Sequence, residues 1–170
     1  QDFGHSHWRN SLIWGENLEN VSIIGSGRID GRALRGARQV ILPGESFAQS
    51  GERVRDSDPG VGNKAIALKG CRNVTLRDFS VFRGGHFALL ATGVDNLTID
   101  NVRVDTNRDG FDIDCCRNVR ISNCHVNSPH DDAIVFKSSY ALGEARATEN
   151  VTLTNCQVSG YGIGSLLDGT

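Results

Sequence analysis

The sequence lacks methionine entirely, has only three prolines in 170 residues, and carries no marked excess of either charge. Its 18 basic and 20 acidic side chains nearly cancel. Such a balance creates no field that would gather nucleic acid or an anionic lipid surface. No apolar run is long enough to cross a bilayer. We therefore expect neither nucleic acid nor membrane as a partner, although a few local cations could hold an acidic substrate.

The chain opens at Gln1 with no charged and apolar leader. Together with the missing methionine, this start predicts that the natural start of translation lies outside the sequence. The length suits one domain with a sizeable core, so we expect residues 1–170 to form a single domain.

Cysteine is present in an odd number, and its spacing fits neither a zinc site nor a dense disulfide framework. The five cysteines are Cys71, Cys115, Cys116, Cys124 and Cys156. We predict buried thiols as their main use, with one disulfide left open.

A short motif recurs along the chain, in which Asn is followed by an apolar, a polar and an apolar residue. Its members begin at Asn20, Asn73, Asn96, Asn118 and Asn150, with separations of 53, 23, 22 and 32 residues. The middle separations indicate a coil of 22 or 23 residues, and the outer ones require insertions. The asparagines also match glycosylation acceptors at four of the five positions, but strand threonines after turn asparagines produce that pattern automatically.

The repeats alternate apolar and polar residues over four to six positions, which is typical of short strands with one buried face. No segment has a long helical stripe, and the leucine-rich consensus is missing. These observations predict an all-β fold, a parallel β-solenoid in which equivalent residues stack. Phe79, Val102, Cys124 and Cys156 each follow the repeat Asn by six positions, so we expect them to form one inward ladder.

Two stretches interrupt the period, at residues 43–63 and 138–148. The first is polar and rich in glycine, and it predicts a long loop leaving the solenoid. The second adds about ten residues directly after an acidic cluster. Loops on a rigid scaffold often line binding clefts, and tolerated surface insertions are the alternative.

Three aspartates carry the strongest chemical signal. Asp109 and Asp131 are 22 residues apart, which is one coil, and Asp132 is adjacent. Neighbouring parallel strands lie ~4.8 Å apart, so the three carboxylates should converge. Crowded like charges push at least one acid toward its protonated form, which suits a general acid and a general base working at one pH. Solvated turn acids or a Ca²⁺ site are the alternatives.

Three segments together resemble family 28 of the glycoside hydrolases, the polygalacturonase and rhamnogalacturonan hydrolase group. They are residues 21–31, with a Gly-Arg-Ile-Asp-Gly turn, Asn-Arg-Asp-Gly at 107–110, and residues 130–138 around the Asp pair. The resemblance covers nearly the whole chain. It implies a right-handed single-stranded parallel β-helix, here incomplete, that needs no cofactor or metal and works in the extracellular space or the periplasm.

The resemblance also implies an activity and a division of roles. The enzyme would cleave pectic polysaccharide or oligosaccharide containing galacturonic acid, by an inverting mechanism. Asp131 would protonate the leaving oxygen, while Asp109 and Asp132 would deprotonate the attacking water. Adjacent-coil stacking alone does not predict inversion, because inverting carboxyl pairs usually lie ~6.5–9.5 Å apart.

The sequence departs from the family pattern at three places. Arg108 replaces a Thr, His130 replaces a Gly, and Tyr161 stands where polygalacturonases have the His of Gly-His-Gly. The chain therefore looks more like the rhamnogalacturonan-type or exo-acting branches. The family's Arg-x-Lys element should follow beyond Thr170, and we expect a full enzyme to continue for several coils.

Several further residues are candidates for binding substrate. Lys137 could pair with a uronate, and His86 lies about one coil before Asp109. A solvated lysine and a turn histidine are the alternatives. The predicted substrate-binding set is His86, Asn107, Arg108, His130, Lys137 and Tyr161. Trp8 and Trp14 are expected to cap the first coil, with stacking on a sugar as the alternative. Asp112 and Asp114 are expected to support a turn.

Three other functions stay open. The acids could bind Ca²⁺ in a lyase like pectate lyase, in which an Arg or Lys abstracts a proton. The β-helix could instead bind glycan without catalysis. Open strand edges at the ends of the solenoid could also pair with a second chain.

Overall fold

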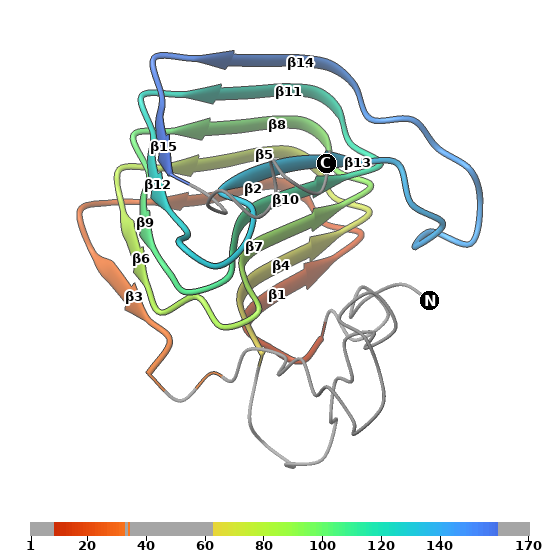
Figure 1. The fold of residues 1–170 in the computed structure, drawn as a ribbon. Helices are drawn as coiled ribbons and strands as arrows, with labels where there is room; N and C mark the ends of the chain where they lie inside the picture. The colour runs from red at the N-terminus through yellow and green to blue at the C-terminus, as the bar shows by residue number, and fades with distance from the viewer. Residues whose placement is uncertain (1–8, 33, 35–62, 160–170) are drawn as a thin grey trace, which may run out of the picture.

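The computed structural model describes residues 9–32, 34 and 63–159. Within these ranges the chain winds through five coils of three strands each, and no described segment is helical (Figure 1). No helix that could span a membrane was found among the described residues. The loop predicted at 43–63 lies outside the described residues except for Asn63, as do Trp8 and Tyr161.

The strands form three parallel sheets, and each coil contributes one strand to each sheet. Sheet A contains β1 (Ser11–Glu16), β4 (Lys64–Lys69), β7 (Phe87–Thr92), β10 (Asp109–Asp114) and β13 (Ile134–Lys137). Sheet B contains β2 (Glu19–Ile24), β5 (Arg72–Arg77), β8 (Asp95–Asp100), β11 (Arg117–Ser122) and β14 (Glu149–Thr154). Sheet C contains β3 (Arg28–Asp30), β6 (Ser80–Phe82), β9 (Arg103–Asp105), β12 (His125–Asn127) and β15 (Gln157–Ser159).

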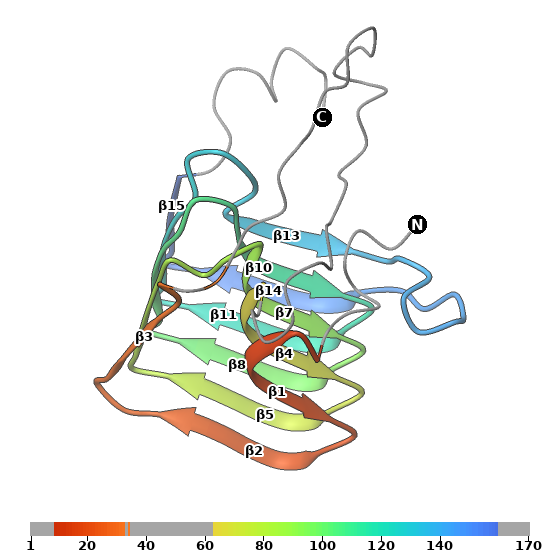
Figure 2. The ribbon, with the colours of Figure 1, turned by 90° about the horizontal axis from the view of Figure 1, so that it is seen from below.

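Every strand pairs with its equivalent in the next coil, and Figure 2 shows the strands of sheet B stacked one above another. Val74, Leu97, Val119 and Val151 are partners in successive coils, as the Asn repeat requires. Their side chains fill or border the central core. The predicted parallel solenoid is therefore confirmed. Residues that are one repeat apart in the sequence are paired in neighbouring strands.

The last described coil presents part of this core to solvent. Phe136, Leu153 and Val158 are in register with the core residues of the preceding coil, yet 42%, 46% and 50% of their surfaces are exposed. The expectation that further coils follow stays a prediction.

The repeat asparagines form a ladder at the start of sheet B. Each has a positive φ of 55 to 58°. The side-chain amide of each donates to the side-chain oxygen of the previous one, at 2.8 to 3.1 Å. Asparagine tolerates the left-handed region and satisfies its own hydrogen bonds there. The ladder runs through Asn20, Asn73, Asn96, Asn118 and Asn150. Each of them is the second residue of its strand, so the asparagines bend the start of a strand and do not lie in the predicted turn.

A second polar ladder follows five residues later, between sheets B and C, and we did not anticipate it. Asp78, Asn101, Asn123 and Asn155 all have a positive φ. Asn101 donates to Asp78 at 3.0 Å, and Asn155 donates to Asn123 at 2.7 Å. The recurring Asp or Asn was visible in the sequence. Unlike the first ladder this one is interrupted, because Asn123 donates to Asp100 at 2.8 Å.

The cysteines act as core residues. All five are free thiols, four are buried, and Cys156 is partly exposed. Cys124 packs in the core with Phe79 and Val102, and Cys156 lies against its edge, so the predicted ladder is confirmed. Burial raises the pKa of Cys116 to about 12, which makes this thiol unreactive.

The insertion at 138–148 does not lie beside the acids. Arg146 pairs with Asp95 and donates to the carbonyl of Gly93 at 3.4 Å. The hydroxyl of Thr148 accepts from the backbone N–H of Cys116 at 3.1 Å. These contacts lie at the turn between sheets A and B, whereas the predicted acids lie where the sheet A strands begin. The expected role as a wall of the carboxylate cleft is therefore corrected: the contacts fix the coil.

Candidate active site

The three predicted aspartates converge at the beginning of two neighbouring strands of sheet A. Asp109 is the first residue of β10, and Asp131 and Asp132 lie in the turn between β12 and β13. One carboxylate oxygen from each lies within 4.8 Å of those from the other two. The one-coil spacing thus brings the groups together, as the sequence predicted.

Gly110 sets the distance between these two coils. A Cβ at this position would lie 2.2 Å from the carbonyl oxygen of Ala133 and 2.3 Å from a methyl of Val126. The missing side chain allows the backbone N–H of Gly110 to donate to the carbonyl of Asp132 at 2.9 Å. Asp109 and the Asp pair are therefore held in register by backbone that only glycine can supply.

Asp109 is the buried member of the cluster, with 5% of its surface exposed. Desolvation, followed by the charge of Asp131, raises the pKa of Asp109 to about 8. One of its oxygens accepts from the backbone N–H of Asp132 at 3.3 Å. At neutral pH this side chain is consequently a protonated acid that can donate a proton.

Asp131 has the opposite environment. Its carboxylate forms an ion pair with the guanidinium of Arg108, and both side chains are mostly buried. The hydroxyl of Ser128 donates to the backbone carbonyl of Arg108, which anchors the arginine. Asp131 therefore lies in an ion pair beside the buried Asp109.

Asp132 lies at the exposed edge of the cluster. Partial desolvation and the charge of Asp131 raise its pKa. Its backbone N–H also donates to Asp131 at 3.1 Å. Of the three acids, it is the most accessible to an incoming molecule.

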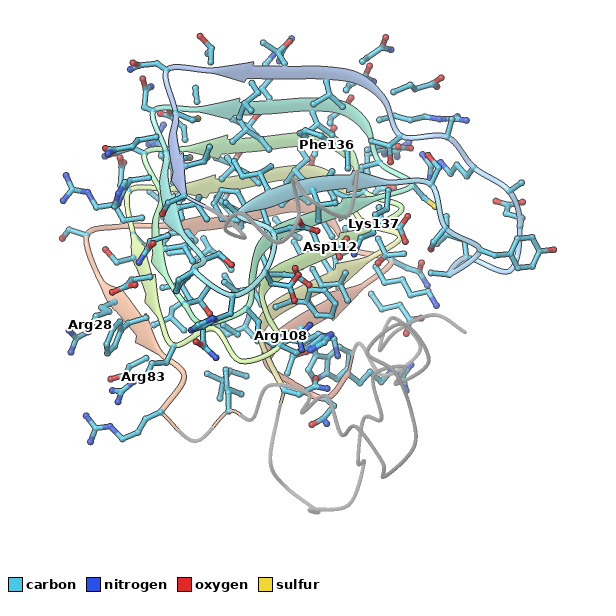
Figure 3. All side chains as sticks on the ribbon, viewed as in Figure 1. Arg28, Arg83, Arg108, Asp112, Phe136 and Lys137 are labelled. Atoms are coloured by element: carbon cyan, nitrogen blue, oxygen red, sulfur yellow. The ribbon has the colours of Figure 1, made fainter. Side chains whose placement is uncertain are left out.

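A groove of about 540 Å³ runs beside the carboxylates, along the corner where sheet C passes into sheet A. Arg32, Arg83 and Arg108 line it from three successive coils, with Phe82 and Asn107 among them. Figure 3 shows the side chains of Arg83 and Arg108. Arg32 and Arg83 were not among the predicted residues. Their signal in the sequence was an arginine shortly after the third strand of each of the first three coils.

Comparison with known proteins agrees with this architecture. The family model for the right-handed β-helix region matches residues 14–170. The chain belongs to the right-handed β-helix family. No curated protein matches it.

A solved structure gives the same result for the fold. The β-helix is similar to a putative glycosyl hydrolase from Parabacteroides merdae ATCC 43184, with 21% sequence identity and a TM-score of 0.62. The similarity covers 86% of this chain and 60% of that protein, so the chain spans less than two thirds of its length. At this identity the similarity concerns the fold alone.

Lys137 is an ion-paired lysine in this β-helix. Its ammonium lies 2.5 Å from a carboxylate oxygen of Asp112, whose side chain is fully buried. Burial opposes the charge of Lys137, but Asp112 and the active-site acids outweigh it and raise the pKa. Substrate binding by Lys137 stays a prediction, with its charge already balanced by Asp112. Figure 3 labels both residues.

The two acids that were expected to support a turn have different roles. Asp114 accepts from the backbone N–H of Ser139 at 2.8 Å, which confirms the prediction for this residue. Asp112 instead anchors Lys137, so the prediction for Asp112 is wrong. Trp14 lies on β1 of the first described coil, under the guanidinium of Arg9 at 5.5 Å, and half of its surface is exposed.

The remaining candidates lie around the same corner. His86 is in register with Arg108, one coil earlier, but it is buried edge-on against Phe87 at 4.2 Å between ring centroids. It therefore does not line an open groove, contrary to expectation. His130 and Asn107 are exposed beside the acids, where substrate could reach them.

The protonation of Asp109 can be measured directly. In a ¹³C-carboxyl NMR titration we expect its midpoint near pH 8, because burial and the charge of Asp131 both favour the neutral acid. Asp131→Asn removes that charge and should move the midpoint to lower pH. Asp78→Asn is the control, since Asp78 lies in the second polar ladder, between sheets B and C. A midpoint near pH 4 in the parent would contradict this assignment.

Proposed function

We propose that this β-helix is a glycoside hydrolase in which Asp109 is the general acid. Asp131, assisted by Asp132, accepts the proton of the attacking water. The observation that carries the proposal is the pairing of a buried aspartate of raised pKa with an ion-paired aspartate, their oxygens within 4.8 Å. Two carboxyl groups whose environments separate their protonation states are what glycosidic cleavage needs.

This division of roles reverses the one implied by the resemblance to family 28. There Asp131 would be the acid, whereas in this chain Arg108, which replaces the family's Thr, forms an ion pair with Asp131. Asp109 already has the burial that favours a proton. Membership of family 28 stays a prediction.

The proposed substrate is pectic polysaccharide or oligosaccharide that contains galacturonic acid. Arginine suits this class because its planar guanidinium binds carboxylates in a fixed geometry. Three arginines line the groove beside the acids. Such a substrate also fits the proposed extracellular or periplasmic location. Because the chain spans 60% of the similar structure, this activity is proposed for the whole protein.

Inversion is the proposed stereochemistry. The short distances within the cluster restrict where the attacking water can lie. The carboxylate oxygens are closer than the ~6.5–9.5 Å of most inverting pairs and nearer to the ~5–5.5 Å of retaining ones. Water would therefore have to lie beside Asp131 and Asp132, on the exposed side of the cluster. If the product kept the anomeric configuration of the substrate, the mechanism would instead pass through a covalent glycosyl-enzyme intermediate.

A calcium-dependent lyase is the second candidate, because three convergent carboxylates could hold a cation. Calcium takes about six to eight oxygen ligands. Among the described residues, only these three acidic side chains gather at the site, and Arg108 already occupies one of them. The arrangement therefore fits acid and base catalysis better than a calcium centre.

The test is to incubate the full-length protein with polygalacturonan and with rhamnogalacturonan fragments. We expect new reducing ends whose first-formed anomer is opposite to that of the substrate, from at least one of the two polymers. A chelator should leave the rate unchanged, and the products should show no double-bond absorbance. Loss of activity on chelation together with unsaturated products would establish the lyase. Glycan binding without cleavage would establish a non-catalytic β-helix.

A further inference from the structure

Two arginines, Arg32 and Arg83, line the end of the groove farthest from the acids. Arg83 binds Asp30 through two nitrogens, at 2.7 and 3.0 Å, and Arg32 lies 3.7 Å from the same carboxylate. The hydrogen bond from Arg83 is the main cause of the lowered pKa of Asp30, which is therefore anionic. Two guanidinium groups thus share the carboxylate of Asp30, and the carboxylate of Asp105 also lines the groove.

Arg32 is the more available of the two guanidinium groups. Its side chain is 78% exposed, and its only contact with Asp30 is the long one. Arg83 is held in place by Asp30 and by the ring of Phe82, 4.6 Å from its guanidinium. A rigid, aromatic-backed arginine beside an accessible one provides a surface that can grip an anionic group.

The floor of the groove includes two glycines, Gly31 and Gly85. A Cβ on Gly31 would lie 2.0 Å from the carbonyl oxygen of Arg83, and one on Gly85 would lie 2.6 Å from that of Asn63. Both glycines line the groove, and larger residues there would have to move the coils apart. The exposed amide of Asn107 lies between this floor and the acids. It offers both a donor and an acceptor to sugar hydroxyls.

We propose that the end of the groove at Arg32 and Arg83 is a distal subsite for a uronate residue of the substrate, remote from the bond that is cleaved. The substrate then runs along the corner between sheets C and A, across the coils that precede the acids. Its cleaved bond lies at Asp109 and Asp131. This subsite rests on the proposed function for its substrate class, and binding alone tests it.

The coil spacing predicts which substrates reach the subsite. Arg32 lies two coils before Arg108 and three before Asp131, and each coil adds ~4.8 Å, so roughly 10 to 15 Å separate the two ends. A short oligosaccharide at the acids cannot span that length. A long one can place a carboxylate beside Arg32.

The experiment measures binding by calorimetry in the full-length protein carrying Asp109→Asn, which removes cleavage. The ligands are a long oligogalacturonide, a disaccharide of the same sugar, and the long oligosaccharide with its carboxyl groups reduced to alcohols. We expect Arg32→Gln to weaken binding of the long acidic ligand about five- to tenfold. Binding of the other two ligands should not change.

Arg72→Gln is the matched control, because Arg72 is a half-exposed arginine on sheet B that also pairs with a carboxylate, Glu19, at 2.6 Å. It should leave the affinity for all three ligands unchanged. Equal affinity of the parent and Arg32→Gln for the long acidic ligand would overturn the subsite, as would no binding at all. If the parent binds in an Arg32-dependent way but never cleaves, the subsite stands and the proposed hydrolase fails.

Discussion

Asp109→Asn is expected to lower kcat on a pectic oligosaccharide by about 10³-fold, within the range that general acids contribute. Asparagine has nearly the same shape as the protonated acid but has no proton to give to the leaving oxygen. The measurement is the release of reducing ends at pH 6 to 7. Both values lie below the pKa of about 8 that burial gives to Asp109, so the parent holds its proton there.

The leaving group distinguishes the acid from the base. A substrate with an aryl leaving group needs little protonation, so Asp109→Asn should lose much less activity on that substrate than on the natural linkage. Asp131→Asn, which impairs the activation of water, should lose similar factors on both. The reverse pattern would restore Asp131 as the acid, as the family resemblance implies.

Asp78→Asn is the matched control for Asp109→Asn. Asp78 lies in the second polar ladder, where the next coils already have Asn101, Asn123 and Asn155. The same chemical change at this corner should therefore leave both folding and kcat unchanged. If Asp78→Asn also lowered kcat strongly, the effect of Asp109→Asn could not be assigned to proton transfer.

The dependence of stability on pH tests whether Asp109→Asn loses activity because it misfolds. Because the pKa of Asp109 is raised on folding, the folded protein holds a proton between pH ~4 and ~8 that the unfolded chain releases. Stability consequently falls as the pH rises through that window. Asp109→Asn removes this slope, so the variant should be at least as stable as the parent at pH 8, which thermal unfolding would show.

The fold could be predicted because the asparagine motif recurs in the sequence once per coil. A solenoid stacks equivalent residues, so the distance between repeat asparagines is also the register of the strands. Asn96 and Asn118 gave the coil length, and that length placed Asp109 over Asp131. The separation within the cluster needed Gly110 as well, and no repeat pattern signals that glycine.

The partners of the acids could not be predicted in this way. Periodicity says which coil and corner a residue occupies, but not how far a long side chain reaches. Arg108 was a candidate for substrate binding, and only the coordinates show that it pairs with Asp131. Arg32 and Arg83 were missed for the same reason, because they lie on different strand ends of the same corner.

The outward face of sheet A departs most from expectation. Alternation along β10 places Phe111 and Ile113 in the core, so Asp112 and Asp114 should face solvent. Both are fully buried instead. A periodic pattern separates two faces but does not reveal that the second face is covered as well. Removing one partner of an ion pair on this face, such as that of Asp112 with Lys137, therefore destabilises the fold more than breaking a surface pair does.

Lys137→Met is expected to lower the free energy of unfolding by about 3 kcal/mol, because it leaves the buried carboxylate of Asp112 without its cation. Urea unfolding at pH 7 measures the loss. An unpaired buried acid has a raised pKa, so the loss should shrink at low pH, where Asp112 can become neutral. The double variant Asp112→Leu, Lys137→Met should recover most of the stability, since a well-packed apolar pair costs no desolvation.

Lys69→Met provides the control in the same rung of sheet A. Lys69 pairs with Thr92, Thr92 with Asp114 and Asp114 with Lys137 along the ladder. No ion pair of Lys69 is found among the described residues, so its replacement should change stability by less than about 0.5 kcal/mol. If both lysine variants lowered the free energy of unfolding equally, the cause would be the loss of any lysine at this position of the sheet and not the unpaired charge of Asp112. A large loss for Lys137 alone, reversed in the double variant, would assign it to Asp112.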